Sequence, residues 1–306
     1  MHSGEKGGLR PWWRSLDRIV SLGWSKLARR NSGEPVLMSL PEQIPLVDRS
    51  DILDQKRRKL DLIASIVRSD MPHRRTQRNY DFLSAELQRQ FKIVATDGVS
   101  AHDYDPFALR LIEAASEGWV LDCGAGKRGR YYDHVVNFEI VDYDTTDVLG
   151  VGEVLPFKDG VFDGVLSLNV LEHVKDPFKC ASEIARVLKP GGKLYCVVPF
   201  LQPLHAFPHH YYNMTAQGLR NLFEPGLHIE RQEMLASGLP IWALCSLVSG
   251  WASGLSGVEK EEFLQMKLAR FLENPIDLLK EPFVKQLSRE KNFELACTTA
   301  LFARKP

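Results

Sequence analysis

Residues 118–129 read GWVLDCGAGKRG, and this stretch decides how the rest of the chain is interpreted. Its apolar start predicts a short buried strand over 119–121 that ends in Asp122. The glycines after it predict a tight turn in which backbone N–H groups can approach a ligand closely. The spacing also matches the Gly-x-Gly-x-x-Gly dinucleotide signature, which is weak without context. The surrounding sequence must therefore identify the ligand.

Strands and helices alternate after this turn. Further strands are predicted over 135–141, 161–168 and 193–198, and a helix over 176–188 that ends at a Lys-Pro-Gly-Gly turn. Helical stretches over 259–272 and 276–288 precede a predicted final strand over 296–304. The alternation predicts an α/β fold with parallel strands and crossover helices.

Two local features favour S-adenosylmethionine over a dinucleotide at the glycine turn. Asp122 lies two positions before Gly124. A carboxylate there can bind an ammonium group, directly or through water, but would repel a pyrophosphate. Only about eight residues separate Gly126 from the next strand, too few for a helix whose N-terminus would neutralise a pyrophosphate.

Four ordered segments resemble the methyltransferase type 11 group of class I S-adenosylmethionine-dependent methyltransferases. They read VLDCGAG at 120–126, LPF at 155–157 with FD at 162–163, LNVLEHV at 168–174, and EIARVLKPGG at 183–192. The resemblance covers about residues 102–235. It implies a Rossmann-like, mostly parallel seven-stranded sheet with an antiparallel last strand and helices on both faces, here with an N-terminal helical extension. It also implies S-adenosyl-L-methionine as cofactor and methyl transfer as the activity.

The resemblance implies a set of cofactor-binding residues when matched position by position. Asp122, Gly124 and Gly126 would hold the methionine part. Glu139, at the end of the second strand, would bind the ribose hydroxyls, with Asp142 as the alternative; either acid could instead be a solvated strand end. Val151 stands where the family often has an acid for the adenine amine. The remaining predicted cofactor residues are Gly152, Glu153 and Asn169. The chain departs from the family at Arg128, which replaces the third glycine of the usual turn.

Histidines after the fourth and fifth strands are the candidate catalytic residues, because ligands bind at the carboxyl ends of strands in open α/β sheets. A general base is needed only if the acceptor is a weak acid such as a hydroxyl. The candidates are His173, His205 and His210, with His209 ranked below them. The alternative is that these loop histidines are polar surface.

The same loop bears on metals and on the acceptor. Glu172 and His173 could contribute to a metal site, as in some related O-methyltransferases, but the sequence shows no further ligand at suitable spacing, so no metal is predicted. Asn169 is not followed by the Pro-Pro-Tyr of many nucleic-acid N-methyltransferases. This argues against an adenine-N6 acceptor. We expect O-methylation of a small-molecule, glycan or lipid-linked acceptor.

Composition restricts partners and location. The formal net charge is +0, which excludes a global basic field for nucleic acid. None of the 5 cysteines forms a CxxC pair, and no cleavable signal peptide is visible, so a cytoplasmic protein is expected. The uncharged stretch 234–258 is long enough to span a bilayer, but its proline and glycines favour a helix packed on the core or lining the acceptor pocket. The oligomeric state is left open by the sequence.

The chain is expected to divide into three parts. Residues 1–47 form a basic arm and linker, 48–101 a helical extension, and 102–306 the methyltransferase domain with a helical insertion at about 236–290. Residues 10–30 are basic and contain three tryptophans, which suits a helix lying in a membrane interface, or a docking helix or partly ordered arm. This motivates an alternative function, a non-catalytic scaffolding module of a membrane assembly. Helices are expected over 49–68, 80–91 and 105–116, with the run Lys56-Arg57-Arg58-Lys59 on a solvated face.

Overall fold

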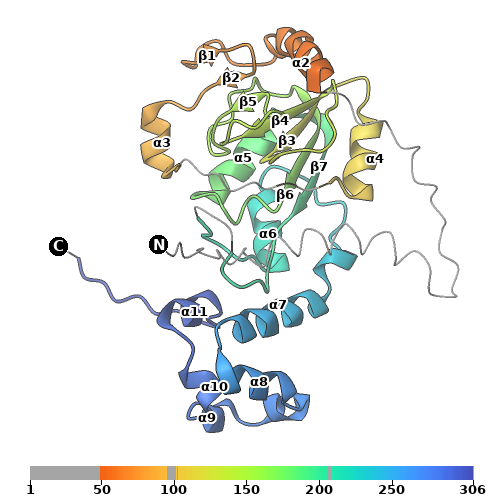
Figure 1. The fold of residues 1–306 in the computed structure, drawn as a ribbon. Coiled ribbons are helices and arrows are strands. Elements are labelled where there is room, and N and C mark those ends of the chain that lie inside the picture. The colour runs from red at the N-terminus through yellow and green to blue at the C-terminus, as the bar shows by residue number, and fades with distance from the viewer. Residues whose placement is uncertain (1–48, 95–100, 102, 206–208, 306) are drawn as a thin grey trace, which may run out of the picture. The chain divides into compact units, whose positions relative to one another are not determined.

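The structure is a computed structural model that describes residues 49–94, 101, 103–205 and 209–305 (Figure 1). The described residues form two compact units: the first holds 49–170 and 176–197, the second 171–175 and 198–305. The predicted arm and linker over 1–47, including the basic stretch 10–30, lie outside the described residues.

A seven-stranded sheet forms the centre of the first unit, in the order β1-β2-β5-β4-β3-β6-β7. The strands are β1 (Arg74–Arg75), β2 (Tyr80–Asp81), β3 (Val120–Cys123), β4 (Val135–Glu139), β5 (Val148–Leu149), β6 (Phe162–Leu168) and β7 (Leu188–Val197). All neighbouring strands run parallel except β1 and β2. The predicted Rossmann-like, mostly parallel sheet of seven strands is confirmed.

The predicted antiparallel last strand is wrong. Residues 296–304 form no strand, and the antiparallel pair is β1–β2 at the edge of the sheet. Leu301 and Phe302 are 91% and 92% exposed, so the apolar residues that suggested a strand pack against nothing that could pair with it. Apolar content alone does not make a strand when no neighbouring strand offers backbone partners.

Helices cover both faces of the sheet, as predicted. The helices of the first unit are α2 (Arg49–Ile63), α3 (Ala85–Phe91), α4 (Pro106–Ala114) and α5 (Pro177–Val187). Ala108 and Ile112 of α4 pack against Val120 of β3. Successive side chains of a strand point to opposite faces, and Cys123, three residues after Val120, contacts Cys180 of α5. The two helices therefore lie on opposite sides of β3.

Side-chain caps fix where these helices begin. The Asp105 carboxylate accepts hydrogen bonds from the amides of Phe107 and Ala108, and Pro106 takes the first helical position, where it loses no hydrogen bond. The same Asp-Pro pair, Asp176 and Pro177, begins α5. The helix predicted over 80–91 begins later, at Ala85, because Tyr80 and Asp81 pair with β5 instead.

The basic run on α2 corrects a sequence expectation. Arg57 and Arg58 are exposed, but Lys56 and Lys59 are 0% and 1% exposed. Residues three and four apart share a helix face, so both lysines lie beside the core residue Leu60. Lys59 Nζ lies 2.6 Å from Asp147 Oδ2 and also donates to the carbonyl of Val135. The expectation that all four basic residues lie on a solvated face is therefore wrong for Lys56 and Lys59, because they lie on the buried face of an amphipathic helix.

The second unit is helical. It contains η1 (Ala236–Gly238), η2 (Leu268–Leu272), α6 (Ala216–Phe223), α7 (Pro240–Ser253), α8 (Gly257–Gln265), α9 (Pro275–Leu278), α10 (Pro282–Lys285) and α11 (Arg289–Glu294). Its core joins Ala252, Phe263 and Phe283 from α7, α8 and α10. Trp251 packs against this core and donates its indole N–H to the carbonyl of Phe283 at 2.8 Å.

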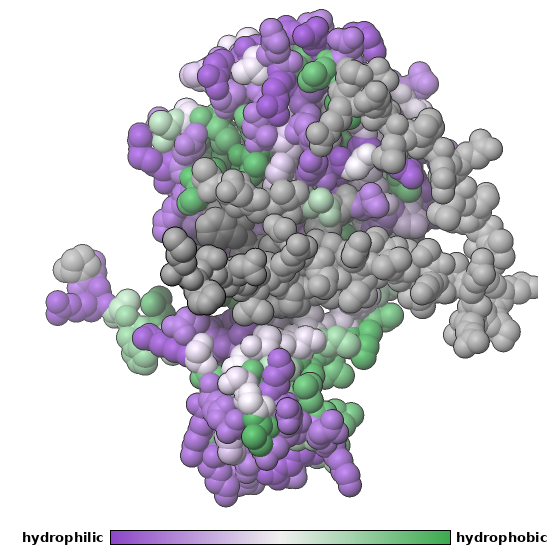
Figure 2. All heavy atoms as spheres, in the orientation of Figure 1, coloured by the Kyte–Doolittle hydropathy of each residue, from purple (hydrophilic) through white to green (hydrophobic). Residues whose placement is uncertain are grey.

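Helix α7 accounts for most of the uncharged stretch 234–258. Several of its apolar side chains are exposed, and hydrophobic atoms gather over it (Figure 2). They are Ile241, Leu244, Leu247 and Val248. In the part of the chain that the structure describes, none of the helices combines the length and the apolar character needed to cross a bilayer.

Candidate functional site

The glycine turn after β3 has the left-handed backbone that its sequence requires. Gly124 has φ +80° and Gly126 φ +62°, conformations that side chains with a Cβ rarely adopt. A Cβ at Gly124 would lie 2.5 Å from Val170 Cγ2. The amides of Gly124 and Ala125 both donate to the carbonyl of Phe138, at 2.9 and 3.1 Å. The turn is thus pinned to β4 and closed to larger residues.

Asp122, predicted to bind the cofactor's ammonium group, is already engaged. Arg128 Nε and Nη2 donate to its two oxygens at 2.8 and 3.1 Å, and the Tyr104 hydroxyl donates at 2.6 Å. Both members of the ion pair are buried, with 3% of the Arg128 side chain and none of the Asp122 side chain exposed. Arg128, the departure from the family turn, therefore neutralises the acid that the turn presents.

The two acids considered for ribose binding have different surroundings. Glu139, the last residue of β4, accepts hydrogen bonds from the amides of Gly126 at 3.2 Å, Val141 at 3.1 Å and Ile140. Burial raises the pKa of Glu139, an effect that these amides oppose. Asp142 instead accepts from the side-chain amide of Asn79 at 2.9 Å. Only Glu139 is directly connected to the glycine turn.

The other predicted cofactor-binding residues lie in two other loops of the first unit. Gly152 and Glu153 form a turn after β5, and a Cβ at Gly152 would lie 2.8 Å from Cys180 Sγ. The buried Glu153 carboxylate accepts from the amide of Asp176, at the start of α5, at 3.3 Å. Asn169, after β6, is exposed and has φ +56°.

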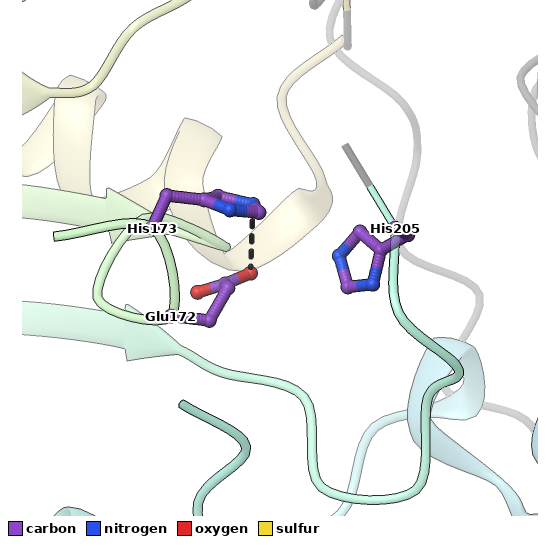
Figure 3. Close-up of side chains that lie close together, drawn as sticks. All are labelled: Glu172, His173 and His205. Carbon is purple, nitrogen blue, oxygen red and sulfur yellow. Dashed lines mark ion pairs between the residues drawn. The ribbon is translucent and has the colours of Figure 1, made fainter. Parts of the chain in front are cut away.

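A second group of functional side chains lies in the second unit. Glu172 and His173 come from the loop after β6, and His205 lies across from them (Figure 3). One ligand atom from each residue falls within 4.8 Å of the other two. The structure thus brings a third candidate ligand to this pair, 32 positions after His173, which spacing in the sequence did not reveal.

The histidines of this unit differ in what their nitrogens do. His173 Nδ1 donates to the carbonyl of His209 at 2.8 Å, and burial lowers the His173 pKa to about 4. His205 Nδ1 donates to the carbonyl of Pro203 at 3.0 Å, and burial lowers its pKa too. Both nitrogens of His210 have partners, the His205 amide and the Asn213 side chain. His173 and His205 therefore each keep an unprotonated Nε2, whereas His210 is engaged in holding the loop.

Sequence reasoning missed two functional contacts. Tyr104 was not singled out, although it donates to Asp122, and its position just before a helix carried no signal of that role. Arg128 was recognised only as a departure from the glycine pattern. A buried acid that lies six residues before an arginine in a tight turn is the signal that could have suggested the ion pair.

Comparison with known proteins agrees with the first unit's architecture. Residues 121–196 match the family model described as Methyltransf_11, a methyltransferase domain. An uncharacterized protein of Methanocaldococcus jannaschii is 38% identical over 102 residues, which cover 29% of this chain and 44% of that protein. A demethylmenaquinone methyltransferase of Renibacterium salmoninarum is 30% identical over 116 residues, 38% of this chain and 43% of that protein.

A solved S-adenosylmethionine-dependent methyltransferase from Thermotoga maritima is 22% identical over 39% of this chain and 69% of its own, with a TM-score of 0.30. The chain spans less than half the length of the two curated relatives above. S-adenosylmethionine is the methyl donor of the matched family. Residues 121–196 of this chain are therefore similar to a methyltransferase domain, Methyltransf_11.

Proposed function

We propose that this chain transfers a methyl group from S-adenosylmethionine to a hydroxyl oxygen of a small-molecule, glycan or lipid-linked acceptor. The observation that carries the proposal is the glycine turn. Its positive φ angles and its hydrogen bond to a carboxylate at the end of the next strand lie inside the segment that matches the family. When bound, S-adenosylmethionine supplies a methyl group activated by its sulfonium.

The residues around the turn fit this cofactor with one change of role. We assign the methionine part to the backbone of Gly124 and Gly126. The ribose is assigned to Glu139, whose carboxylate can accept more hydrogen bonds than the three amides give it. Asp122 acts through Arg128: the ion pair holds the turn in place instead of presenting a bare carboxylate to the ammonium group.

We assign the adenine end of the cofactor to the loops after β5 and β6. Gly152, Glu153 and Asn169 follow the ends of β5 and β6, and ligands in open α/β sheets bind beyond the carboxyl ends of strands. The Glu153 side chain is buried against the start of α5, so we assign this end to the backbone of Gly152 and Glu153. Asn169, which is exposed, completes the set.

Oxygen as the methylated atom is supported by the second unit. Methylation of a hydroxyl requires loss of its proton, whereas alignment alone serves a more nucleophilic acceptor. Because burial keeps His173 and His205 neutral at physiological pH, each retains a nitrogen lone pair that can accept that proton when no cation is bound to it. His210 supports the loop and is not assigned a catalytic role.

Calorimetry with S-adenosylmethionine tests the cofactor assignment with a matched pair of glycine variants. Gly124 and Gly191 share φ +80°, but a Cβ at Gly191 meets nothing within 4 Å. Gly124→Ala should lose binding by about 100-fold or more, since Val170 must be displaced, while Gly191→Ala should bind like the wild type. Equal affinity in both variants, or binding of NAD in place of the methyl donor, would refute the assignment. A labelled-donor screen against a cell extract would then identify the acceptor.

A further inference from the structure

Glu172 is a buried acid without a hydrogen-bond donor. Its side chain is fully buried, and neither carboxylate oxygen has a hydrogen-bond partner among the described residues. Burying a polar group without a partner is unfavourable, and more so for a charged one. His173 Nε2 lies 3.7 Å from Glu172 Oε1, which is too long for a hydrogen bond. The site therefore lacks something that the carboxylate would bind.

The two neighbouring histidines cannot supply the missing donor. A backbone carbonyl can only accept a hydrogen bond, so the contacts to His209 O and Pro203 O require a proton on Nδ1 of His173 and of His205. A neutral imidazole then carries a lone pair on Nε2. Each ring therefore offers an acceptor toward the shared space.

Three lone-pair groups thus face one another with no positive charge among them. Their ligand atoms lie within 4.8 Å of one another, with His205 opposite the Glu172–His173 pair (Figure 3). A proton on Glu172 would remove its charge, but the 3.7 Å separation leaves no hydrogen bond to His173. A cation shared by all three groups would give the carboxylate and both imidazoles a common partner.

We propose that Glu172, His173 and His205 bind one divalent transition-metal ion, Zn²⁺ or an ion of similar preference, through a carboxylate oxygen and two imidazole Nε2 atoms. Two imidazoles with one carboxylate suit Zn²⁺, whereas Mg²⁺ and Ca²⁺ prefer oxygen ligands. Three protein ligands leave at least one position open for water or an oxygen of another molecule, as in catalytic zinc sites.

The surrounding contacts match those of a metal site. The carbonyl of His209 fixes the orientation of the His173 ring, and the carbonyl of Pro203 fixes that of His205. Backbone carbonyls often have this role beside metal-bound histidines. His210 accepts from the His205 amide at 3.2 Å and donates to Asn213 at 2.9 Å, so it positions His205 and is no ligand itself. Ligands of tetrahedral zinc lie about 3.4 Å apart, so binding would draw these three groups closer together.

Metal content and affinity of the untagged full-length chain test the proposal directly. Chelator-stripped protein dialysed against Zn²⁺ should retain one ion per chain by elemental analysis, and Co²⁺ should give visible absorption bands typical of a low-coordinate site. Competition with a chromophoric chelator gives the dissociation constant. Glu172→Gln and His205→Asn should each weaken Zn²⁺ binding by about 100-fold or more, a larger loss than is usual for residues that only orient a ligand.

His209→Ala is the matched control, because it removes a histidine from the same loop while keeping the backbone carbonyl that His173 uses. It should bind Zn²⁺ within about twofold of the wild type. Circular dichroism of each variant checks folding, and either ligand variant alone suffices if the other fails to fold. A wild-type chain that retains no ion, one that prefers Mg²⁺, or equal losses in His205→Asn and His209→Ala would overturn the proposal.

The metal site does not depend on the proposed methyl transfer. Zn²⁺ binding is measured without cofactor or acceptor, and S-adenosylmethionine binding is measured on the stripped protein. Each proposal can therefore fail while the other stands.

Discussion

Two fully buried carboxylates, one in each unit, have opposite surroundings. Asp122 accepts three hydrogen bonds, two from Arg128 and one from Tyr104, whereas Glu172 accepts none among the described residues. Burial raises the pKa of Glu172 to about 8, so it holds its proton at neutral pH in the absence of a cation. Asp122 has all the hydrogen-bond partners expected of a structural group. Glu172 lacks partners, as expected of a group that binds a ligand. The contrast separates scaffold from site more clearly than burial alone.

Removing the charge from each acid in turn should give the largest difference. Asp122→Asn leaves the buried Arg128 guanidinium without its anion and should lower the free energy of unfolding by about 3–5 kcal/mol. Glu172→Gln resembles the protonated acid and loses no donor, so it should change stability by less than about 1 kcal/mol. Urea unfolding at pH 7 with chelator and without cofactor measures both. Similar losses of unfolding free energy in the two variants would mean that the different hydrogen bonding of the two acids does not affect stability.

The same contrast can be tested on the two buried lysines of α2. Lys59 has the Asp147 carboxylate at 2.6 Å, but Lys56 donates to the carbonyl of Asp144, and burial lowers its pKa from 10.5 to about 8. Between these values the unfolded chain holds a proton that the folded protein has released, so stability rises with pH. From pH 8 to 10 the wild type should gain about 2 kcal/mol relative to Lys56→Met.

Unfolding midpoints measured across this pH range give the difference. Arg57→Met, which alters the exposed side of the same helix, should show the wild-type pH dependence. A Lys56→Met profile parallel to the wild type would show that Lys56 does not titrate in this range.

A smaller effect is expected where a carboxylate has only backbone donors. Glu139→Gln should weaken S-adenosylmethionine binding by about tenfold, or about 1.4 kcal/mol, because the ribose hydroxyls lose a charged acceptor beside Gly126. Asp142→Asn should change affinity by less than about twofold, since Asp142 is held by Asn79. Calorimetry compares the two, and the reverse order would move the ribose role to Asp142.

The position and parallel direction of the central strands could be predicted because local signals agreed. Apolar runs mark β3 and β6, and the glycine turn follows β3. The Lys-Pro-Gly-Gly segment follows the end of α5 as predicted, but it lies inside β7, which begins at Leu188 and not at the predicted residue 193. Positive φ at Gly124 and Gly126 also follows from residue type. These features depend on neighbours in the sequence, and such signals are reliable when they are consistent with one another.

What could not be predicted depends on distant partners. Strand β2 is two residues long and exists because Tyr80 pairs with Val148. The burial of Lys59 requires Asp147, and the third member of the proposed metal site, His205, is brought to Glu172 by loops that no periodic pattern describes. The ion pair between Asp122 and Arg128 joins nearby residues, yet the family comparison implied a different use for the acid.

The short strand β2 also decides how the protein can be shortened. The segment that matches the family begins at residue 121, well after β2 and α2. A fragment cut there would leave the backbone of β5 without a neighbour on one side and Asp147 without its lysine. Unpaired sheet edges recruit other chains, so such a fragment would form aggregates. Expression boundaries for this protein therefore belong ahead of α2, whatever the extent of the family match.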